Sequence, residues 1–222
     1  MGHVKTAVDD GSETMTTEAS GRPYRSALRE EQAEQTRMRI ARAARDRFVE
    51  RGWAGTSVRS VAVAAGVSEA TVYAVYGNKA GLATSLIDSA DADADTDRAI
   101  ADLEAAAGDP RGQLAAFVRF DRRLFENAGE LIRVIAEGRR NEPALQAAYA
   151  EGRRRGDQVR REVFQTWPTA AFRSGITLDR ALDAYAVAIS VETYDLAIHE
   201  RGWTPDILEG WWIQLLGQAL LN

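Results

Sequence analysis

Two short helical segments joined at a glycine constrain this chain more than any other feature of its sequence. The first follows Ser57 and stops at Gly66, and the second follows Ser68 and stops at Gly77. Each serine can cap a helix start by accepting a hydrogen bond from a free backbone N–H, and each glycine can end a helix. Two short helices that meet at a glycine turn, the second opening with small and hydroxyl side chains, have the sequence outline of a helix-turn-helix.

The rest of the sequence predicts an all-α fold. Apolar residues recur at helical spacing, and no period-two strand pattern competes with them. A break is expected near Gly108–Pro110, because proline cannot continue a helix. Asp179 and Thr204 suit helix caps, and Pro143 and Pro205 suit first-turn positions. Asn78 can cap a further helix that runs through Leu86 and Ile87 into the acidic stretch from Asp88. Other helices are expected over about 30–51, 111–127, 130–139, 143–167, 179–200 and 205–221.

Composition divides the chain into three parts. Residues 1–24 are rich in Thr, Ser, Gly, Asp and Glu without sustained apolar periodicity, which predicts a disordered arm. An N-terminal three-helix head that carries the helix-turn-helix is expected over residues 25–80, and a larger C-terminal helical domain over residues 81–222.

The charge of the chain is unevenly distributed. The net charge is -5, yet the segment from Gln35 to Ala80 holds eight basic and three acidic residues, which gives +5 and leaves -10 for the remainder. This asymmetry indicates a polyanionic partner for one segment. The alternative is that the arginines only solvate the outer face of a helix.

Several classes of protein are disfavoured by composition. Cysteine is absent and His3 and His199 are the only histidines, so disulfides, thiolate nucleophiles and the usual zinc sites are not expected, and neither is a cofactor. No apolar run approaches the roughly 20 residues of a membrane span, and the N-terminus is acidic where a signal peptide would be basic and then apolar. A cytoplasmic protein without a membrane partner is expected. The sequence contains no nucleophile elbow, phosphate loop or histidine dyad that would support an enzyme, for instance a carboxylate-based hydrolase.

The segment around the two short helices resembles the DNA-binding domain of the tetracycline-repressor (TetR) family. The residues that carry the resemblance are Arg39-Ile40, Ala43-Ala44, Phe48, Arg51-Gly52-Trp53, Thr56-Ser57-Val58, Val61-Ala62, Ala65-Gly66-Val67-Ser68, Thr71-Val72-Tyr73, Tyr76, Asn78-Lys79 and Leu82. The resemblance implies a DNA-binding head followed by a helical domain that binds a ligand and dimerises.

The second short helix is expected to enter the major groove of double-stranded DNA with its N-terminal residues nearest the base edges. The expected DNA-binding residues are Ser57, Arg59, Ser68, Glu69, Ala70, Thr71, Tyr73 and Lys79. For Tyr73 and Lys79 a contact to the DNA backbone is what the family resemblance implies, and the same resemblance makes Tyr76 a packed aromatic. Glu69 has an alternative role, because an acidic side chain in a first turn is stabilised by the helix dipole without DNA.

The two C-terminal helices are apolar on more than one stripe, so each needs two partners. One stripe can cover its own subunit and the other can meet a second copy in a four-helix bundle, as the resemblance implies. The alternative is a monomer that buries both stripes internally. The expected dimer residues are Ala184, Ala188, Val191, Ile198, Trp211, Trp212 and Leu215.

Apolar and aromatic side chains are spread over the central helices, where the TetR family holds its inducer. Most can be plain core, and a subset is expected to line a pocket, with Arg123, Tyr185 or Glu192 as polar anchors. The candidate ligand residues are Phe117, Phe120, Arg123, Leu124, Ile135, Tyr149, Phe164, Trp167, Tyr185, Ile189 and Glu192. The arginines between Arg153 and Arg161 are interpreted as a solvated helix face.

The resemblance implies a one-component regulator that binds a pseudo-palindromic operator as a homodimer and leaves it when a small-molecule effector binds. The helix that starts near Lys79 is the expected lever, since it joins the head to the pocket. The alternatives are a transcriptional activator and a ligand-independent architectural DNA-binding protein.

Overall fold

The computed structural model describes residues 21–93 and 95–222, with side chains for residues 29–86 and 95–222. This part of the chain is all-α, as the sequence predicts, with one isolated β-bridge between Phe172 and Leu221. Its described residues divide into two compact units, one that ends at Met38 and one that begins at Arg39. Most of the arm expected over residues 1–24 lies outside the described residues, and the first helix begins at Gly21, earlier than expected.

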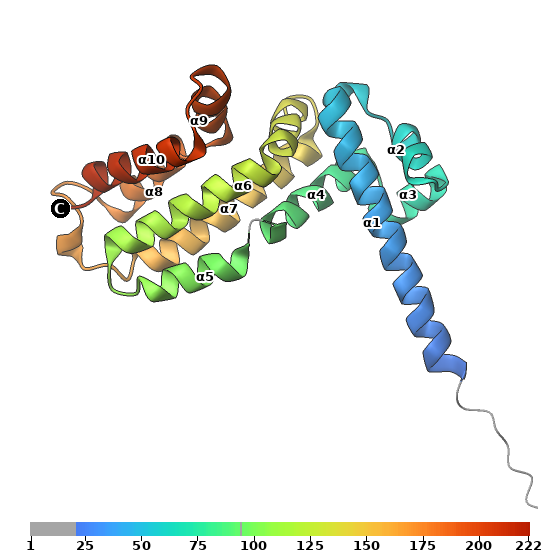
Figure 1. Ribbon diagram of the computed structural model, residues 1–222, viewed down its shortest axis with the longest axis horizontal. Helices are drawn as coiled ribbons and strands as arrows, with labels where there is room; N and C mark the ends of the chain where they lie inside the picture. The colour runs from blue at the N-terminus through green and yellow to red at the C-terminus, as the bar shows by residue number, and fades with distance from the viewer. Residues whose placement is uncertain (1–20, 94) are drawn as a thin grey trace, which may run out of the picture. The chain divides into compact units, whose positions relative to one another are not determined.

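Figure 1 shows the order of the helices along the chain. They are α1 (Gly21–Gly55), α2 (Val58–Ala65), α3 (Glu69–Tyr76), α4 (Lys79–Asp93), α5 (Thr96–Ala105), α6 (Pro110–Gly138), α7 (Pro143–Phe164), η1 (Thr169–Ala171), α8 (Leu178–Ala188), α9 (Val191–Asp195), η2 (Leu196–Glu200) and α10 (Pro205–Leu220). No single described helix is long and apolar enough to cross a membrane, and only the bent pair of α2 and α3 meets that criterion together.

The caps of the two short helices are confirmed. Ser57 caps α2 in a reciprocal capping box with Ser60, and Gly66 ends that helix in the left-handed conformation, with φ 65°. Ser68 caps α3 by accepting a hydrogen bond from the backbone N–H of Thr71. Left-handed backbone strains residues that have a Cβ, so glycine at position 66 allows the sharp turn. The helix-turn-helix is therefore encoded by residues within one turn of each helix end.

Helix α1 bends where the sequence predicts its end. Gly52 has φ 67° and ψ -177°, which is outside the helical region, and the chain continues for one more short turn to Gly55. Ile40, Ala44 and Phe48 upstream of this bend are buried. They form the floor of the head's core, on which α2 and α3 pack through Val61 and Val72.

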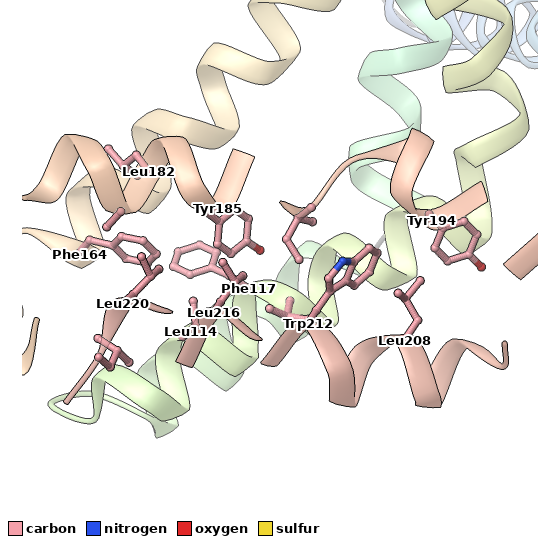
Figure 2. Close-up of a cluster of buried hydrophobic side chains, with 14 of the residues drawn as sticks. Leu114, Phe117, Phe164, Leu182, Tyr185, Tyr194, Leu208, Trp212, Leu216 and Leu220 are labelled. Atoms are coloured by element: carbon pink, nitrogen blue, oxygen red, sulfur yellow. The ribbon is translucent and has the colours of Figure 1, made fainter. Parts of the chain in front are cut away.

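Helix α6 is the centre of the larger part of the fold. It packs against α4, α5, α7, α9 and α10. Its start is confirmed, because Asp109 caps it and Pro110 stands in its first turn. Figure 2 shows the core that α6 shares with α7, α8, α9 and α10, which includes Phe117, Tyr185 and Trp212.

The expected break near residues 127–130 is wrong, because α6 runs unbroken through Gly129. A glycine in a helix interior costs about 1 kcal/mol relative to alanine, so sequence alone favours a break there. The nearest atoms to a Cβ at this position would be Val191 Cγ2 at 3.9 Å and Phe125 Cβ at 4.0 Å. Packing against α9 therefore keeps the helix continuous.

The single helix expected over residues 179–200 is also wrong. Ile189 is extended, with φ -101° and ψ 95°, and Ser190 caps a new helix, α9, which continues into the π-helical turn η2. The start of α8 is capped by Thr177 and not by Asp179.

An unexpected break also separates α4 from α5, where Asp95 has φ 62° and caps α5. The caps Thr204 and Asn78 are confirmed, as are the first-turn positions of Pro143 and Pro205.

Candidate functional site

The geometry of α2 and α3 is that of a helix-turn-helix. The two helices bend by 108° across the three residues from Gly66 to Ser68, within the roughly 90–120° of such motifs. Val72, on the inner face of α3, is 1% exposed, whereas its neighbour Tyr73 is 49% exposed. The helix therefore has a packed face and a face that is open to solvent.

Most of the expected DNA-binding residues are exposed to solvent. Six of them are exposed and two, Thr71 and Lys79, are half-buried; the exposed ones are Ser57, Arg59, Ser68, Glu69, Ala70 and Tyr73. The Ser68 and Thr71 hydroxyls lie 2.8 Å apart, so the cap of α3 also holds Thr71 in place. Tyr76 packs against the head's core, in agreement with its expected role.

One charge pair links the starts of the two helices. Arg59 Nε lies 4.0 Å from Glu69 Oε1, and both side chains are largely exposed. Exposed pairs at this distance contribute little to stability. Arg59 and Glu69 can therefore separate at small cost when either meets another charge.

Lys79 is held by Trp53. Its ammonium donates a 2.5 Å hydrogen bond to the Trp53 carbonyl and lies 4.1 Å from the centre of the indole ring. Burial lowers the pKa of Lys79 from its ordinary value, and the charge of Glu142 opposes that shift. Trp53 in turn stacks on Phe48, with ring centres 5.5 Å apart. The position of Lys79 is thus tied to the core of the head.

Two adjacent cavities lie beside α6 in the larger part of the fold. Cavity A, of about 120 Å³, is lined by Asp121, Leu124, Phe125, Ile132, Ile135, Tyr149, Gly152, Arg153, Asp157, Arg160, Tyr185, Ala186, Ile189 and Val191. Cavity B, of about 260 Å³, is lined by Thr96, Ala99, Ile100, Leu103, Ala116, Phe117, Phe120, Asp121, Leu124, Gly152, Arg155, Gly156 and Val159. They share Asp121, Leu124 and Gly152, so one piece of wall separates them.

A buried polar cluster forms part of the wall of cavity A. Asp121 Oδ2 accepts hydrogen bonds from the Tyr185 hydroxyl at 2.6 Å and from the Arg160 guanidinium at 2.7 Å. The Asp121 and Arg160 side chains are 6% and 12% exposed. Burial raises the pKa of Tyr185 well above its ordinary value, and the charge of Asp121 adds to the shift. Tyr185 is therefore a neutral donor to the carboxylate at any ordinary pH.

A comparison with known protein families gives a match in the head. Residues 40–86 match the family model described as bacterial regulatory proteins, tetR family. The match covers α2, the turn and α3, together with the parts of α1 and α4 that pack on them. Residues 40–86 are therefore similar to the DNA-binding domain of the TetR family.

Solved structures of TetR-family and related regulators share the fold. NalD of Pseudomonas aeruginosa, the secondary repressor of the MexAB-OprM multidrug efflux pump, is 21% identical with a TM-score of 0.69, over 86% of this chain and 98% of that one. A regulator from Saccharomonospora viridis in complex with choline is 18% identical with a TM-score of 0.69, over 85% of this chain and 99% of that one. FadR of Bacillus subtilis in complex with stearoyl-CoA is 20% identical with a TM-score of 0.65, over 82% of this chain and 98% of that one. No curated protein matches the chain.

The candidate ligand residues fall into three groups. Those that line cavity A are Leu124, Ile135, Tyr149, Tyr185 and Ile189, and those that line cavity B are Phe117, Phe120 and Leu124. Phe164 and Trp167 line neither cavity; they stack on each other in the core, with ring centres 4.1 Å apart. Arg123 and Glu192 also line neither, and Glu192 is exposed.

Sequence reasoning missed Asp121 and Arg160. The interpretation of the arginines between Arg153 and Arg161 as a solvated face is wrong for Arg160, because its guanidinium is buried against Asp121, and for Arg153, which donates to the Ala186 carbonyl at 3.1 Å. A signal was present: Asp121 lies four residues after Phe117 and so falls on the apolar face of α6. A carboxylate there needs a buried donor.

The expected dimer residues are divided between surface and core. Trp211 and Leu215 are exposed, whereas Val191 and Trp212 are buried within the subunit's own core. Ala184, Ala188 and Ile198 are half-buried. The exposed members extend to Ile207, which was not singled out and is 56% exposed.

The head and the cavities meet at the C-terminal end of α6. Leu131, Val134, Ile135 and Leu145 belong to the same buried cluster as the head's core. A Cβ on Gly138, the last residue of α6, would lie 2.7 Å from Trp53 Cγ and 2.8 Å from Leu145 Cδ1. Since both atoms are held in the core, the absence of a side chain at position 138 permits this contact.

Gly138→Ala is expected to lower the free energy of unfolding by about 1–3 kcal/mol, the usual cost of overpacking a core. Gly129→Ala is the matched control in the same helix, because its Cβ would meet neighbours at ordinary distances of 3.9 Å and 4.0 Å. That control is expected to raise stability by up to about 1 kcal/mol through helix propensity. Urea unfolding of both variants measures the difference, and equal effects would contradict the close contact with Trp53.

Proposed function

We propose that this protein is a TetR-family repressor that binds a pseudo-palindromic DNA operator as a homodimer and is released from it by a small-molecule effector. The observation that carries the proposal is the open face of α3, which presents Ala70 and Tyr73 to solvent on a helix held by a packed opposite face. A helix exposed in this way fits the major groove of B-DNA. Residues 25–80 serve as the DNA-binding part, and residues 81–222 as the part that binds the effector and dimerises.

The residues of the head divide by the kind of contact they suit. Ala70 and Thr71 are placed near base edges, where a methyl group can touch thymine and a hydroxyl can bond to a base. Ser57, Tyr73 and Lys79 suit the phosphates, which position the protein without reading sequence. Lys79 exchanges its bond to the Trp53 carbonyl for a phosphate oxygen in this scheme.

A gel-shift and footprinting experiment on the DNA upstream of the chain's own gene tests the operator. The expected result is protection of two half-sites related by a dyad, roughly one helical turn apart, with binding that survives excess unrelated DNA. Uniform coating of all DNA would indicate an architectural protein instead. Transcription from the protected promoter that rises when the protein is added would indicate an activator.

Dimerisation is assigned to one face of α10. Ile207, Trp211 and Leu215 recur every four residues and are 56%, 40% and 38% exposed. The opposite face of α10 is occupied: Trp212 is in the core, and Glu209 pairs with Arg119 of α6 at 3.7 Å. An apolar stripe left open on a helix whose opposite face is packed suits a second copy in a four-helix bundle.

Trp211→Glu is expected to convert the dimer to a monomer, because a charge buried at a symmetric interface is buried twice. Light scattering after size-exclusion chromatography measures the mass. Val63→Glu, at an exposed valine of α2, is the control and should leave the mass unchanged. A Trp211→Glu protein that keeps the dimer mass would remove α10 from the interface.

The effector site is assigned to cavities A and B. Relatives with this fold hold choline in one case and stearoyl-CoA in another, so the fold does not specify the effector. Ile135 and Tyr149 line cavity A and also pack in the cluster that contains the head's core. A ligand that displaces these side chains acts directly on the packing of α1 and α4, which gives the release of DNA a physical route.

A further inference from the structure

Cavities A and B have the dimensions of two halves of one site. Each is on the order of the roughly 150 Å³ cavity that holds a benzene ring, at about 120 Å³ and 260 Å³. Asp121, Leu124 and Gly152 belong to both walls. These three residues therefore mark the place where the two cavities adjoin.

Glycines of α7 make the room at this junction. Gly152 and Gly156 stand one helical turn apart, and a glycine inside a helix is destabilising relative to alanine. A Cβ on Gly156 would lie 2.9 Å from Arg160 Nη1, so this glycine leaves space for the guanidinium to fold back toward Asp121. Gly152 has no side chain where the two cavities adjoin. At both positions the helix is less stable than it would be with alanine, and the missing side chain leaves space beside the polar cluster.

The charged side chains in the described wall of cavity A sum to zero, because two carboxylates, Asp121 and Asp157, stand against two guanidiniums, Arg153 and Arg160. Both carboxylates lie beside Arg160, at 2.7 Å and 3.3 Å. Arg153 donates to the Ala186 carbonyl, and Tyr185 donates to Asp121. A charged ligand group would have to break one of these interactions or remain unpaired, and an unpaired buried charge is costly. An uncharged group meets no such penalty.

The described wall of cavity B is mainly apolar. It contains Phe117, Phe120 and Val159, and its charged members are the paired Asp121 and the solvent-exposed Arg155. Water screens the charge of an exposed arginine, which weakens its attraction for an anion. Cavity B is therefore suited to a hydrocarbon chain.

We propose that the effector of this regulator is an elongated, uncharged and mostly apolar molecule that occupies cavities A and B together and passes Gly152. The inference rests on the proposed function, since it assigns a chemical class to the effector of that site. Asp121 stands at the junction of the two cavities, and its polar cluster with Arg160 and Tyr185 in the wall of cavity A disfavours a ligand that would bury a charge there.

Binding of four probes to the full-length protein tests the class directly. They are 2-decanone, decanoate, decylammonium and 2-butanone, measured by isothermal titration calorimetry below their micelle concentrations. The expected result is that 2-decanone binds at least tenfold more tightly than each of the other three. Equal or tighter binding of decanoate or decylammonium would overturn the uncharged class, and equal binding of 2-butanone would overturn occupation of both cavities.

Gly152→Leu tests the passage, because a leucine there adds four carbon atoms to the wall that the cavities share. It is expected to weaken 2-decanone binding at least tenfold. Ala150→Leu, at an exposed position of the same helix, is the matched control and should bind 2-decanone as the parent does. Thermal unfolding shows whether both variants fold, and a folded Gly152→Leu protein with parental affinity would contradict the proposal.

Release of the operator DNA is measured in a separate experiment, so that a failure of the ligand class is distinguished from a failure of the release mechanism. If 2-decanone binds and Gly152→Leu abolishes the binding, the ligand class stands even when the operator complex is unaffected. In that outcome the release mechanism of the proposed function fails. If no probe binds while the operator is protected, the ligand class fails and the DNA-binding function stands.

Discussion

A protein carrying both Thr71→Ala and Tyr73→Ala is expected to bind its operator at least a hundredfold more weakly than the parent. A hydrogen bond from a side chain contributes about 0.5–1.5 kcal/mol, and about 1.5–3 kcal/mol when its partner is charged, as a phosphate is. The double variant loses two such contacts in each head, and a dimer places two heads on the operator. A hundredfold corresponds to about 2.7 kcal/mol, so the expected loss is modest beside the number of contacts removed. Fluorescence anisotropy at fixed salt measures the change.

Loss of the helix cap must be separated from loss of the DNA contact. Thr193 occupies the same place in α9 as Thr71 does in α3, with its hydroxyl 3.1 Å from the hydroxyl of the cap residue Ser190. Thr193→Ala is therefore the matched control, and it should bind the operator normally. Parental affinity in the double variant, with the dimer mass retained, would exclude α3 as the reading helix.

Arg160→Met is expected to lower the free energy of unfolding by about 3–5 kcal/mol. The substitution leaves the Asp121 carboxylate buried without its cation, and an uncompensated buried charge carries a cost of this size. The Tyr185 hydroxyl still donates to Asp121, but a neutral donor does not balance a full charge. Chemical denaturation with urea measures the loss, with the slope of the transition as a check that the unfolding reaction is the same.

Removal of the whole polar cluster gives the contrasting result. The triple variant Asp121→Leu, Arg160→Met and Tyr185→Phe leaves no buried charge and no orphaned hydroxyl, and apolar replacements of a buried pair are often neutral or stabilising. It is expected to be more stable than Arg160→Met alone. A triple variant at least as unstable as the single one would show that the cost comes from lost packing and not from the buried carboxylate.

The head could be predicted from sequence because its signals are local. Ser57, Gly66 and Ser68 each act within one turn of their own position, so the order of residues along the chain contains the information. The same holds for Gly52, which ends the regular part of α1 as expected. Exposure of Tyr73 followed from its place next to the inward-facing Val72 on a short helix.

The larger part of the fold depends on contacts between distant residues, and there the sequence was a weaker guide. Gly129 suggested a break that close packing against Val191 removes. The break at Ile189 has no glycine or proline to mark it. The polar cluster joins three helices through Asp121, Arg160 and Tyr185, so none of its members is identified by its own neighbours in sequence.

If cavity A holds the effector, as proposed, the double role of Ile135 limits how this protein can acquire a new one. Because that side chain lies in the wall of cavity A and in the cluster that supports the head, a substitution that reshapes the cavity there also disturbs the DNA-reading helices. Asp157 and Ala186 line the same cavity outside that cluster. Changes of ligand preference during evolution are therefore expected to accumulate at these positions first, while position 135 stays the same.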